Sequence, residues 1–477
     1  MIVGREREKQ RLESLYHSKK SELVAVYGRR RVGKTYLVRE TFSNKDCDFV
    51  YSVGQKKASH ERQLEIFTEA LSEAYYRNAP ILPPKNWDAA FKLLHSEIMS
   101  SNRKVVIFLD ELPWMAKPRS GLLSTIEYYW NRHWQQLEKV KLIVCGSSAA
   151  WIIKKIIHDK GGLHGRITAK IKVDPFTLYE SESYLKYRNI KLNQKQITAI
   201  YMALGGIPYY LNYLERGLSA EQNIQKCFFD EHAPLNGEFK LLFESLFTKA
   251  PAYIEIVRLI AKKNEGMSRS DIQKQVKLTS LGGYLSERLQ DLCMAGFLEE
   301  YIPFNKTHGE YYKVIDEFCL FNLSWLKERK RYLDDYWLSQ AHTAGFVAWS
   351  GFAFEALCRK HIQQIANALK IKTSGVVSAW RSSKQVKSGA QIDLLIERFD
   401  DTITVCEIKF TEKPFKIDKA YADVLKNKLK VFQEQTKTTK QLFLAMIAAG
   451  GLKETMYSEE LVSSVVTLSD LFKSLTD

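Results

Sequence analysis

The stretch ELVAVYGRRRVGKTYLVRE, residues 22–40, places a run of apolar residues before the pattern G-x-x-x-x-G-K-T and a helix-forming segment after it. In a loop with this pattern, backbone N–H groups and the N-terminus of the following helix surround phosphate groups. Lys34 would reach the β and γ phosphates, and the Thr35 hydroxyl would bind Mg²⁺. The sequence therefore predicts a site for ATP and Mg²⁺ at Gly28, Arg29, Arg30, Arg31, Val32, Gly33, Lys34 and Thr35.

Acidic residues that would complete such a site follow a second apolar run, KVVIFLDELPW, residues 104–114. Asp110 would hold Mg²⁺, and Glu111 would polarise the attacking water, which predicts hydrolysis rather than binding alone. A third apolar run, KLIVCGSS, ends in Ser147 and Ser148. Their hydroxyls would either sense the γ phosphate from the neighbouring strand or form an ordinary turn.

Apolar runs at about residues 22–28, 47–53, 104–110 and 141–147 alternate with helical stretches. This alternation is typical of a parallel sheet that is covered by helices on both faces. The segment GGLHGRIT follows and contains Arg166. Arg166 either supplies positive charge to the γ phosphate, in its own subunit or across an oligomer interface, or is a surface residue in a Gly-rich turn.

Length and composition indicate a multidomain globular protein. A chain of 477 residues is long enough for several domains with separate cores. Its seven cysteines include no C-x-x-C pair, which favours reduced thiols and a cytoplasmic protein, and no apolar run is long enough to span a membrane. The formal net charge of +16 predicts attraction to polyanions, with nucleic acid as the first candidate partner.

The pattern changes over residues 253–304, where three short helices and a pair of strands are expected. Ser268 is placed to cap the second helix. Apolar residues recur at helical spacing at Ile272, Val276, Leu281, Leu285, Leu289 and Leu292. This arrangement predicts a winged helix-turn-helix. Because the presumed recognition stretch, residues 278–289, carries a single arginine, DNA contact and a purely structural role both stay open.

A second group of chemically active residues lies in the last part of the chain, which begins near Trp349. Glu355 is expected on a helix, WSGFAFEALCRKHI. The segments AQIDLLIER and TITVCEIKF, residues 390–398 and 402–410, are expected to be strands joined by a turn. An antiparallel hairpin would put Asp393 opposite the region of Glu407, while Glu407 and Lys409 would share one face of their strand.

This grouping suits hydrolysis of a phosphodiester bond. Asp393 and Glu407 would bind one or two Mg²⁺ ions, Lys409 would orient or deprotonate the attacking water, and Glu355 would add a ligand. The alternative is a solvent-facing strand with alternating charges, but the apolar neighbours leave little room for it: Ile392, Leu394, Val405, Ile408 and Phe410. Nearby basic residues would follow a DNA backbone: Arg381, Lys384, Lys387, Lys426, Lys428 and Lys430.

The motifs GREREKQRL, GRRRVGKT, FLDELPW, CGSS, GGLHGR and GGIPYYL together resemble the archaeal-type ATPase family, which is similar to the AAA+ and STAND ATPases. The segment YYKVIDEFCLFNLSW and the last domain resemble that family's usual C-terminal partner, which is similar to PD-(D/E)xK nucleases. The resemblance implies that the segment around Gly4 and Arg5 lies near the adenine, and that residues 206–208 form part of a lid. It also implies activity linked to DNA.

We therefore expect an α/β multidomain protein. Residues 1–236 would form a P-loop ATPase domain with a helical lid, residues 237–345 a winged helix-turn-helix with connecting helices, and residues 346–477 an α/β restriction-endonuclease-like domain. The expected function is that of an ATP-hydrolysing protein that acts on DNA and carries a Mg²⁺-dependent nuclease-like tail, in genome defence or mobile-element biology, with a possible homo-oligomer. The alternatives are a regulatory ATPase whose tail binds DNA or protein without cleaving, and a winged-helix transcriptional regulator.

Overall fold

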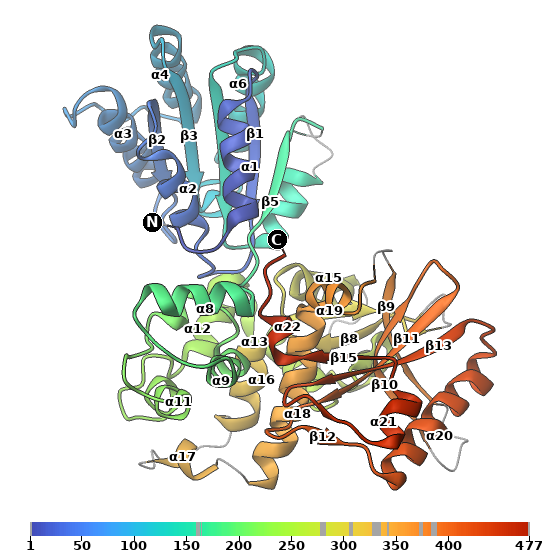
Figure 1. The fold of residues 1–477 in the computed structure, drawn as a ribbon. Helices are drawn as coiled ribbons and strands as arrows, with labels where there is room; N and C mark the ends of the chain where they lie inside the picture. Colours follow the sequence, from blue (N-terminus) through green and yellow to red (C-terminus); the bar gives the residue numbers. More distant parts are fainter. Residues whose placement is uncertain are drawn as a thin grey trace. The chain divides into compact units, whose positions relative to one another are not determined.

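The computed structural model describes residues 2–158, 163, 165–276, 283–304, 309–326, 335–340, 343–371, 375–382 and 389–475. The chain divides into two compact units, Met1–Pro175 and Phe176–Asp477 (Figure 1). The first unit holds the predicted nucleotide site, and the second holds the predicted lid, the middle module and the C-terminal domain. The three domain boundaries drawn from the sequence stay predictions, because this division distinguishes only the two units.

A five-stranded sheet forms the centre of the first unit. Its strands are β1 (Glu22–Tyr27), β2 (Cys47–Val53), β3 (Lys104–Asp110), β4 (Val140–Gly146) and β5 (Ala169–Lys172). The strand order is β2-β3-β4-β1-β5, and every neighbouring pair is parallel. The parallel sheet predicted from the four apolar runs is confirmed. The short fifth strand was not anticipated.

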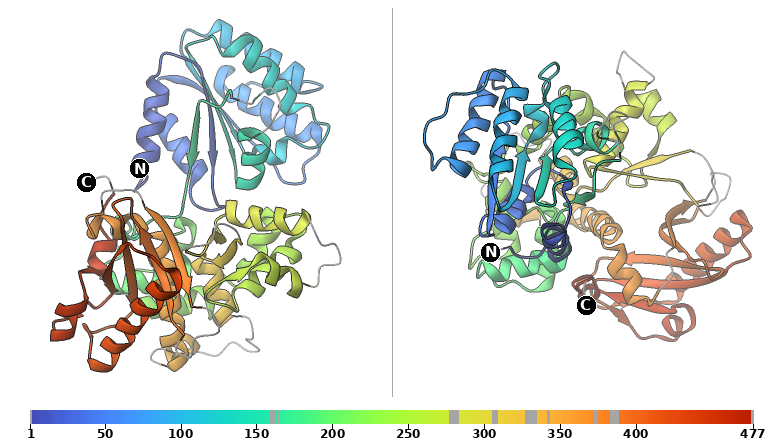
Figure 2. Two further views of the ribbon diagram at one scale, coloured as in Figure 1. Left: turned by 90° about the vertical axis from the view of Figure 1, so that its right-hand side faces the viewer. Right: turned by 90° about the horizontal axis from the view of Figure 1, so that it is seen from above.

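Helices cover both faces of this sheet, as Figure 2 shows. On one face, Leu23 and Ala25 of β1 belong to a core that also contains buried side chains of α3, α4 and α6. On the other face, aromatic rings pack in a series that runs from α1 and α2 to β2 and β3: Tyr16, Phe42, Phe49, Tyr51 and Phe108. The helices are α1 (Glu6–His17), α2 (Lys34–Phe42), α3 (His60–Tyr75), α4 (Trp87–Ser100) and α6 (Leu122–Tyr129), with the short α5 (Leu112–Met115) and α7 (Ala149–Ile152) at the strand ends.

The second unit begins with five helices, of which the first four fall within the segment predicted to include the lid. They are α8 (Leu178–Tyr187), α9 (Gln194–Leu204), α10 (Pro208–Leu211), α11 (Ala220–Phe228) and α12 (Glu238–Leu246). They pack against α16 (Glu317–Trp325), which lies much later in the chain. Tyr210 stacks on Phe318 with ring centroids 4.7 Å apart, and Phe228 lies 4.7 Å from Phe321. The helices therefore share a core with the chain that follows the middle module.

The middle module contains the three helices and the strand pair expected from the sequence. They are α13 (Ala250–Ile260), α14 (Arg269–Gln275), α15 (Gly283–Met294), β7 (Leu298–Tyr301) and β8 (Tyr311–Val314), and the two-residue strand β6 (Met267–Ser268) joins the antiparallel sheet. The Ser268 hydroxyl accepts a hydrogen bond from the Asp271 N–H at 3.1 Å, which confirms the predicted cap. Leu281, one of the predicted apolar positions, lies outside the described residues.

The C-terminal part is a mixed sheet of order β15-β13-β11-β10-β9. Its strands are β9 (Val376–Arg381), β10 (Gln391–Glu397), β11 (Thr402–Lys409), β13 (Gln441–Ala448) and β15 (Ser464–Thr467). The expected antiparallel hairpin is confirmed, with Leu394 opposite Cys406. On one face α20 (Lys419–Thr436) completes a core through Leu425 and Phe432, and α18 (Ala344–Lys360) contacts the sheet through Phe354, whose ring lies 5.0 Å from Phe410.

Two further features concern the cysteines and the helices that the structure describes. All seven cysteines have free thiols, and six of them are buried. No helix within the described ranges is both long enough and apolar enough to cross a membrane.

Candidate functional site

The phosphate-binding loop joins β1 to α2 and needs glycine at two positions. Gly28 has φ 146°, and a Cβ atom there would lie 2.1 Å from the carbonyl oxygen of Val173, which follows β5. Gly33 has φ 91°, in the left-handed region that side chains disfavour, and it directly precedes the first residue of α2. The two glycines therefore fix a tight turn that aims backbone N–H groups and a helix N-terminus at one point.

Lys34 lies buried beneath this loop. Its Nζ donates hydrogen bonds to the carbonyl oxygens of Gly28 at 3.0 Å and Arg29 at 2.8 Å. Burial lowers the pKa of its ammonium, although the nearby charges of Glu111 and Asp110 act in the opposite direction. The lysine is thus placed at the centre of the loop, where a phosphate group would replace neutral carbonyls as its acceptor.

The N-terminal segment contacts the same loop. Arg5 precedes α1 with φ 64°, is almost fully buried, and donates a hydrogen bond from Nη2 to the carbonyl oxygen of Val32 at 2.9 Å. The resemblance implies that this segment lies near the adenine, and that placement stays a prediction.

Thr35 and Asp110 meet at the carboxyl end of β3. The Thr35 hydroxyl donates to Asp110 Oδ2 at 2.5 Å, and the backbone N–H of Glu111 donates to Asp110 Oδ1 at 2.9 Å. A hydroxyl and a carboxylate so close together, beside a phosphate loop, are oxygen ligands of the kind that Mg²⁺ prefers. These two residues therefore fit the predicted metal position in the nucleotide site.

Glu111 is held by a neighbouring strand end. Its Oε2 accepts hydrogen bonds from the Ser147 N–H at 3.1 Å and from the Ser147 hydroxyl at 2.9 Å. Burial raises the pKa of the Glu111 carboxyl, and the hydrogen bond from Ser147 and the charge of Lys34 moderate that rise. Ser147 is therefore engaged with the presumed hydrolytic glutamate, whereas the Ser148 side chain makes no capping hydrogen bond to α7.

Arg166 and residues 206–208 were also predicted to contribute to the nucleotide site. Arg166 lies exposed in a turn, where its N–H donates to the carbonyl of Leu163 at 3.0 Å, so its role toward the γ phosphate stays a prediction. Residues 206–208 belong to the second unit, where the N–H of Phe176 donates to the Gly206 carbonyl at 2.7 Å. Their part as a lid also stays a prediction.

Glu407, in the C-terminal sheet, is surrounded by donors. Its carboxylate accepts from the Tyr421 hydroxyl at 2.5 Å, forms an ion pair with Lys409 Nζ at 3.1 Å, and accepts from the ammonium of Lys428. Burial acts to raise the pKa of this carboxyl, but the charges of Lys428 and Lys409 hold it below its usual value. The predicted contact between Glu407 and Lys409 is confirmed, and Glu407 is an ionised, fully engaged carboxylate.

Asp393 lies within β10 and directly precedes Leu394, which pairs with Cys406 of β11. If this register continues by one residue, Asp393 lies opposite Glu407, as the sequence predicts. The pairing of β10 with β9 shifts between Ile392 and Leu395, so Asp393 lies in a bulge of the kind that redirects side chains near functional sites. Its Oδ1 accepts from the Gln391 amide at 2.5 Å, and its carbonyl accepts from Arg359 at 2.8 Å.

Glu355 extends from α18 toward the same group. Burial, followed by the charge of Asp393, raises the pKa of Glu355 to about 7; Lys313 lowers it and Glu407 adds to the rise. The Glu355 Oε2 lies 3.8 Å from Lys313 Nζ. The three carboxylates thus act on one another electrostatically, yet within the described part of the chain no three His, Cys, Asp or Glu side chains are arranged to hold a metal ion. The predicted Mg²⁺ ligands are near one another but do not converge as a ligand set.

The comparisons with known proteins concern both parts of the chain. Residues 2–214 match the model of a family described as an ATPase domain predominantly from Archaea. The chain carries a P-loop ATPase domain. An uncharacterised protein of Methanocaldococcus jannaschii, MJECL04, is 25% identical over 439 residues, which cover 89% of this chain and 91% of that protein. An uncharacterised ATP-binding protein of the same organism, MJ0423, is 44% identical over 45 residues, 9% of this chain and 76% of its own.

Among solved structures, the Walker-type ATPase PABY2304 of Pyrococcus abyssi has a TM-score of 0.49 at 21% identity, and the match covers 68% of this chain and 96% of that one. The Aeropyrum pernix ORC2 protein has a TM-score of 0.46 at 14% identity, with 67% and 93% covered.

Several residues around the C-terminal carboxylates of this P-loop ATPase chain were missed or misread in the sequence. Lys428 was expected to follow a DNA backbone, but it is largely buried and bonded to Glu407. Its spacing of seven from Tyr421 would have placed both on one face of α20. Lys313 comes from the middle module, and no local pattern links it to Glu355. Lys384 and Lys387 lie outside the described residues.

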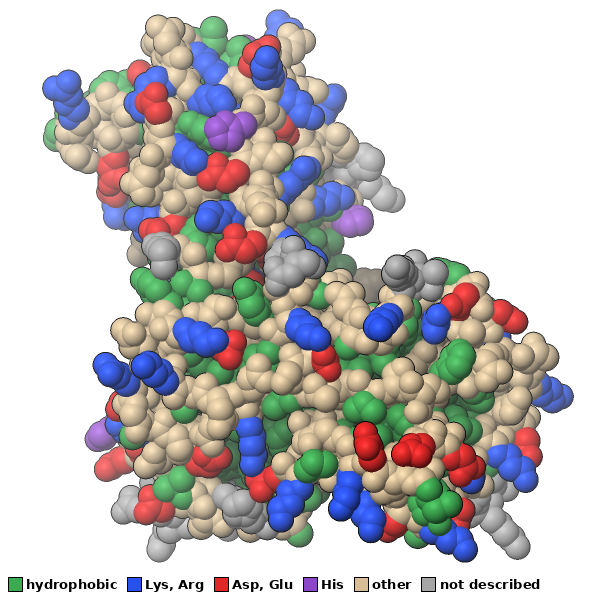
Figure 3. Space-filling model, viewed as in Figure 1, with side chains coloured by type: hydrophobic (Ala, Val, Ile, Leu, Met, Phe, Trp, Pro, Cys, Tyr) green, Lys and Arg blue, Asp and Glu red, His purple; other side chains and the backbone are tan. Residues whose placement is uncertain are grey.

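Other basic residues of the predicted set are paired with acids. Arg381 bonds to Glu265 at 2.7 Å, Lys426 to Glu460 at 2.7 Å, and Lys430 lies 3.9 Å from Glu434. On the face drawn in Figure 3, Lys and Arg side chains are scattered among Asp and Glu side chains. The net positive charge therefore does not by itself locate a binding surface.

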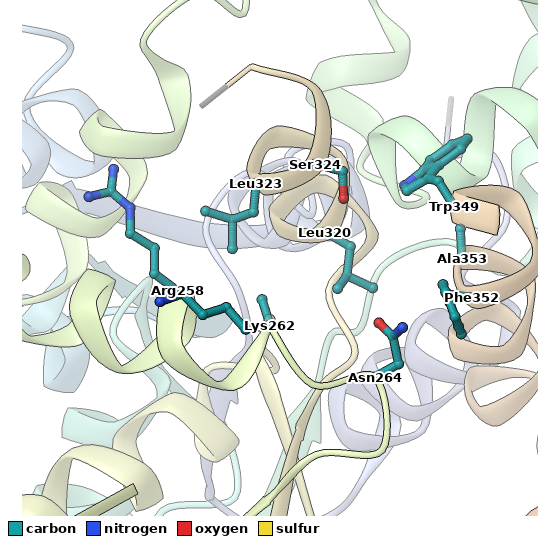
Figure 4. Close-up of a pocket in the computed structure, with 10 residues that line it drawn as sticks. Arg258, Lys262, Asn264, Leu320, Leu323, Ser324, Trp349, Phe352 and Ala353 are labelled. Atoms are coloured by element: carbon teal, nitrogen blue, oxygen red, sulfur yellow. The ribbon is translucent and has the colours of Figure 1, made fainter. Parts of the chain in front are cut away.

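A separate pocket of about 350 Å³ lies where α13, α16 and α18 meet. Figure 4 shows Arg258 of α13, and Lys262 in the turn that follows this helix, across the pocket from Trp349 and Phe352 of α18. None of the candidate site residues lines it, so it is distinct from both the phosphate loop and the carboxylate group.

Proposed function

We propose that this protein hydrolyses ATP at the phosphate loop and acts on DNA through its C-terminal domain, which cleaves phosphodiester bonds with the help of Mg²⁺. The observation that carries the ATPase part is the meeting of Lys34, Thr35 and Asp110 at one end of the parallel sheet, with the Thr35 hydroxyl 2.5 Å from the Asp110 carboxylate. In such a site the chain supplies positioning and charge for transfer of the γ-phosphoryl group.

Each side chain has a defined part in this proposal. The loop N–H groups and Lys34 would bind the phosphates, and Thr35 and Asp110 would hold Mg²⁺, which neutralises phosphate charge. Glu111 would orient the attacking water. Ser147, which donates two hydrogen bonds to this carboxylate, would hold it in place.

The nuclease part rests on the arrangement of Asp393, Glu407 and Lys409. Asp393 and Glu407 are next to Leu394 and Cys406, which pair in the hairpin, and Lys409 lies 3.1 Å from Glu407. The raised pKa of Glu355, about 7, is typical of carboxyl groups gathered at a catalytic site. A metal bound there would draw the carboxylates together at the expense of their lysine contacts.

A regulatory ATPase whose tail binds DNA without cutting it is the second candidate. The observation that favours it is the engagement of the carboxylates by Lys313, Lys409 and Lys428, which leaves Glu407 neutralised on two sides. In this alternative the C-terminal cluster is a structural network, and nucleotide state would control assembly on DNA.

We also propose that α13, α14, α15 and the β7–β8 pair form a winged helix-turn-helix with a structural role. The single arginine of the presumed recognition stretch, Arg288, is only 8% exposed and lies about 6 Å from the Tyr253 and Tyr284 rings. A side chain so placed is withdrawn from DNA, which weighs against a transcriptional regulator that reads bases through this helix.

The deciding experiment is cleavage of supercoiled and linear DNA by the purified protein with Mg²⁺ or Mn²⁺, with and without ATP. Asp393→Ala and Lys409→Ala should remove nicking while DNA binding, measured by gel shift, is retained. Cleavage that persists in both variants would place the nuclease activity elsewhere. If the wild-type protein hydrolyses ATP and binds DNA but never cuts, the regulatory ATPase is the correct function.

A further inference from the structure

A polar cavity of about 780 Å³ lies within the second unit between the middle module and the C-terminal sheet. The middle module lines it with Lys263, Tyr301 and Lys313, and the sheet lines it with Trp380, Arg381 and Asp393. A volume of this size is within the range of ligand-binding sites in proteins. Asp393, a residue of the proposed nuclease site, therefore opens onto a space that two modules build together.

Lys313 lines this cavity but comes from the middle module and not from the C-terminal domain. It lies on β8, its side chain is 11% exposed, and its one ion pair with a described residue, Glu355 of α18, is long at 3.8 Å. Burial lowers the pKa of this ammonium, while the charges of Glu355 and Asp393 act to raise it. A buried cation held by one long ion pair gains more from a new anionic partner than a cation already bonded at close range.

The rest of the lining indicates which anion fits. Arg359 and Arg381 add guanidinium groups, which already pair with Glu299 at 2.6 Å and with Glu265 at 2.7 Å. The Arg359 guanidinium lies 5.4 Å from the centre of the Tyr301 ring, and the Trp380 ring also lines the cavity. Single-stranded nucleic acid binds to positive side chains through its phosphates and to aromatic rings through its bases. The acids Asp271 and Asp393 line the cavity as well, so Lys263 and Lys313 are the cations that a phosphate would meet.

We propose that a single DNA strand enters this cavity and that Lys313 binds the phosphate next to Asp393, leaving its contact with Glu355. Glu355 is then free to join Asp393, so the middle module both contributes to the site and keeps it closed until a strand is present. The inference rests on the proposed function in one respect, namely that the phosphate belongs to DNA.

The test measures binding of a short fluorescein-labelled DNA strand by anisotropy, in EDTA, so that cleavage plays no part. Lys313→Met should weaken binding about tenfold and reduce the slope of log Kd against log salt concentration by about 0.7, the value for one lost phosphate contact on a single strand. Lys313→Arg should restore most of the affinity. Lys440→Met is the matched control, because Lys440 also pairs with a glutamate, Glu397, at 2.9 Å but does not line the cavity.

An unchanged salt slope in Lys313→Met, equal losses in the Lys313 and Lys440 variants, or no strand binding by the wild-type protein would each overturn the proposal. Tighter binding of duplex than of single strand would also overturn it. Should Lys313→Met fail to fold, Lys313→Met combined with Glu355→Gln removes both charges and carries the same expectation. Strand binding with the expected slope but no cleavage in Mg²⁺ would refute the nuclease function and leave the binding site standing.

Discussion

Lys34 holds its own loop by donating hydrogen bonds to the Gly28 and Arg29 carbonyls. These neutral acceptors can be exchanged for phosphate oxygens, which form stronger, charge-assisted hydrogen bonds. The geometry of the loop is thus set by glycines and by backbone carbonyls before ATP arrives, so that little reorganisation accompanies binding.

Lys34→Ala should reduce ATP turnover by about 100-fold or more, because it removes the cation that faces the β and γ phosphates. Phosphate release measured with excess ATP checks this. Lys45→Ala, which removes a partly exposed lysine paired with Glu13 at 2.7 Å in the same unit, should leave turnover unchanged. Normal turnover in Lys34→Ala, with an unchanged circular dichroism melt, would show that ATP is hydrolysed elsewhere.

Ser147→Ala should lower kcat about tenfold with little change in KM, because Glu111 loses the hydroxyl that fixes its carboxylate and small misplacements of a catalytic group are costly. The neighbouring serine provides the control. Ser148→Ala should behave as the wild-type protein, since its hydroxyl does not cap α7. Equal effects of the two substitutions would remove Ser147 from the mechanism.

The sequence predicted contacts between side chains that are close in the chain or that a hairpin turn brings together. Asp393 could be placed opposite Glu407 because the hairpin turn fixes the register. Lys313 could not be linked to Glu355, because their contact depends on how the middle module packs on α18. Ser147 was a candidate site residue, but its contact with Glu111 was not predicted, because a serine at a strand end can face either a phosphate group or an acidic side chain.

The long helix α20 supplies a comparison of buried and exposed lysines. Lys428→Met should lower the free energy of unfolding by about 2 kcal/mol, because it leaves the largely buried Glu407 with less compensating charge. Lys426→Met, two residues away, removes an exposed ion pair with Glu460 and should change it by less than about 0.5 kcal/mol. Thermal denaturation followed by circular dichroism measures the stability of both variants. An equal loss of stability in the two would contradict the larger contribution predicted for the buried Lys428–Glu407 pair.

The junction of α18 with α19 (Ile362–Ala368) contains a buried histidine. The Nε2 atom of His361 accepts from the Leu178 N–H at 3.0 Å, which requires a neutral ring, and burial lowers the pKa of His361 to about 4. The unfolded chain takes up this proton more readily than the folded one. The contribution of His361 to stability is therefore complete above about pH 6.5 and is lost as pH falls toward 4.

The loss should reach about 3 kcal/mol by pH 4. Denaturation midpoints measured from neutral to acidic pH should fall more steeply for the wild-type protein than for His361→Gln, which has no ring to protonate. If the midpoints of the two proteins fall in parallel with pH, the folded and unfolded states bind the His361 proton equally, and its pKa is not lowered by folding.

Among the elements, long apolar strands and amphipathic helices were predictable and short ones were not. Strands β1, β3 and β4 are almost entirely buried, so their composition is nearly continuous in apolar residues. Strand β5 has only four residues and alternates buried with exposed positions, a pattern too short to separate from a loop. Strand β6 has two residues and exists because β8 pairs with it.

For the whole chain, the division after Pro175 predicts that residues 1–175 fold without the rest, since the core around α3, α4 and the parallel sheet is complete within them. This fragment should melt cooperatively and bind a fluorescent ATP analogue. A fragment that ends at residue 168 lacks β5 and Val173 and should lose several kcal/mol of stability. Similar melts for the two fragments would contradict the importance of the last strand.

The placement of α8 to α12 shows what a sequence cannot convey about a whole molecule. Their amphipathic patterns predicted helices, but a pattern does not say which apolar partner covers it. The partner within the second unit is α16, which lies about a hundred residues later and contributes Phe318 and Phe321. The prediction that the helices before residue 236 form a lid on the ATPase domain came from the family resemblance alone.

Gly28 has a mechanical consequence. It opens the phosphate loop, it touches Val173 closely enough to exclude any side chain, and the Val173 N–H donates to the Tyr27 carbonyl at 2.8 Å. Val173 is two residues from the point where the chain leaves the first unit. A displacement of the loop when phosphate binds or departs would therefore move the backbone at Val173, and with it the segment that connects the two units.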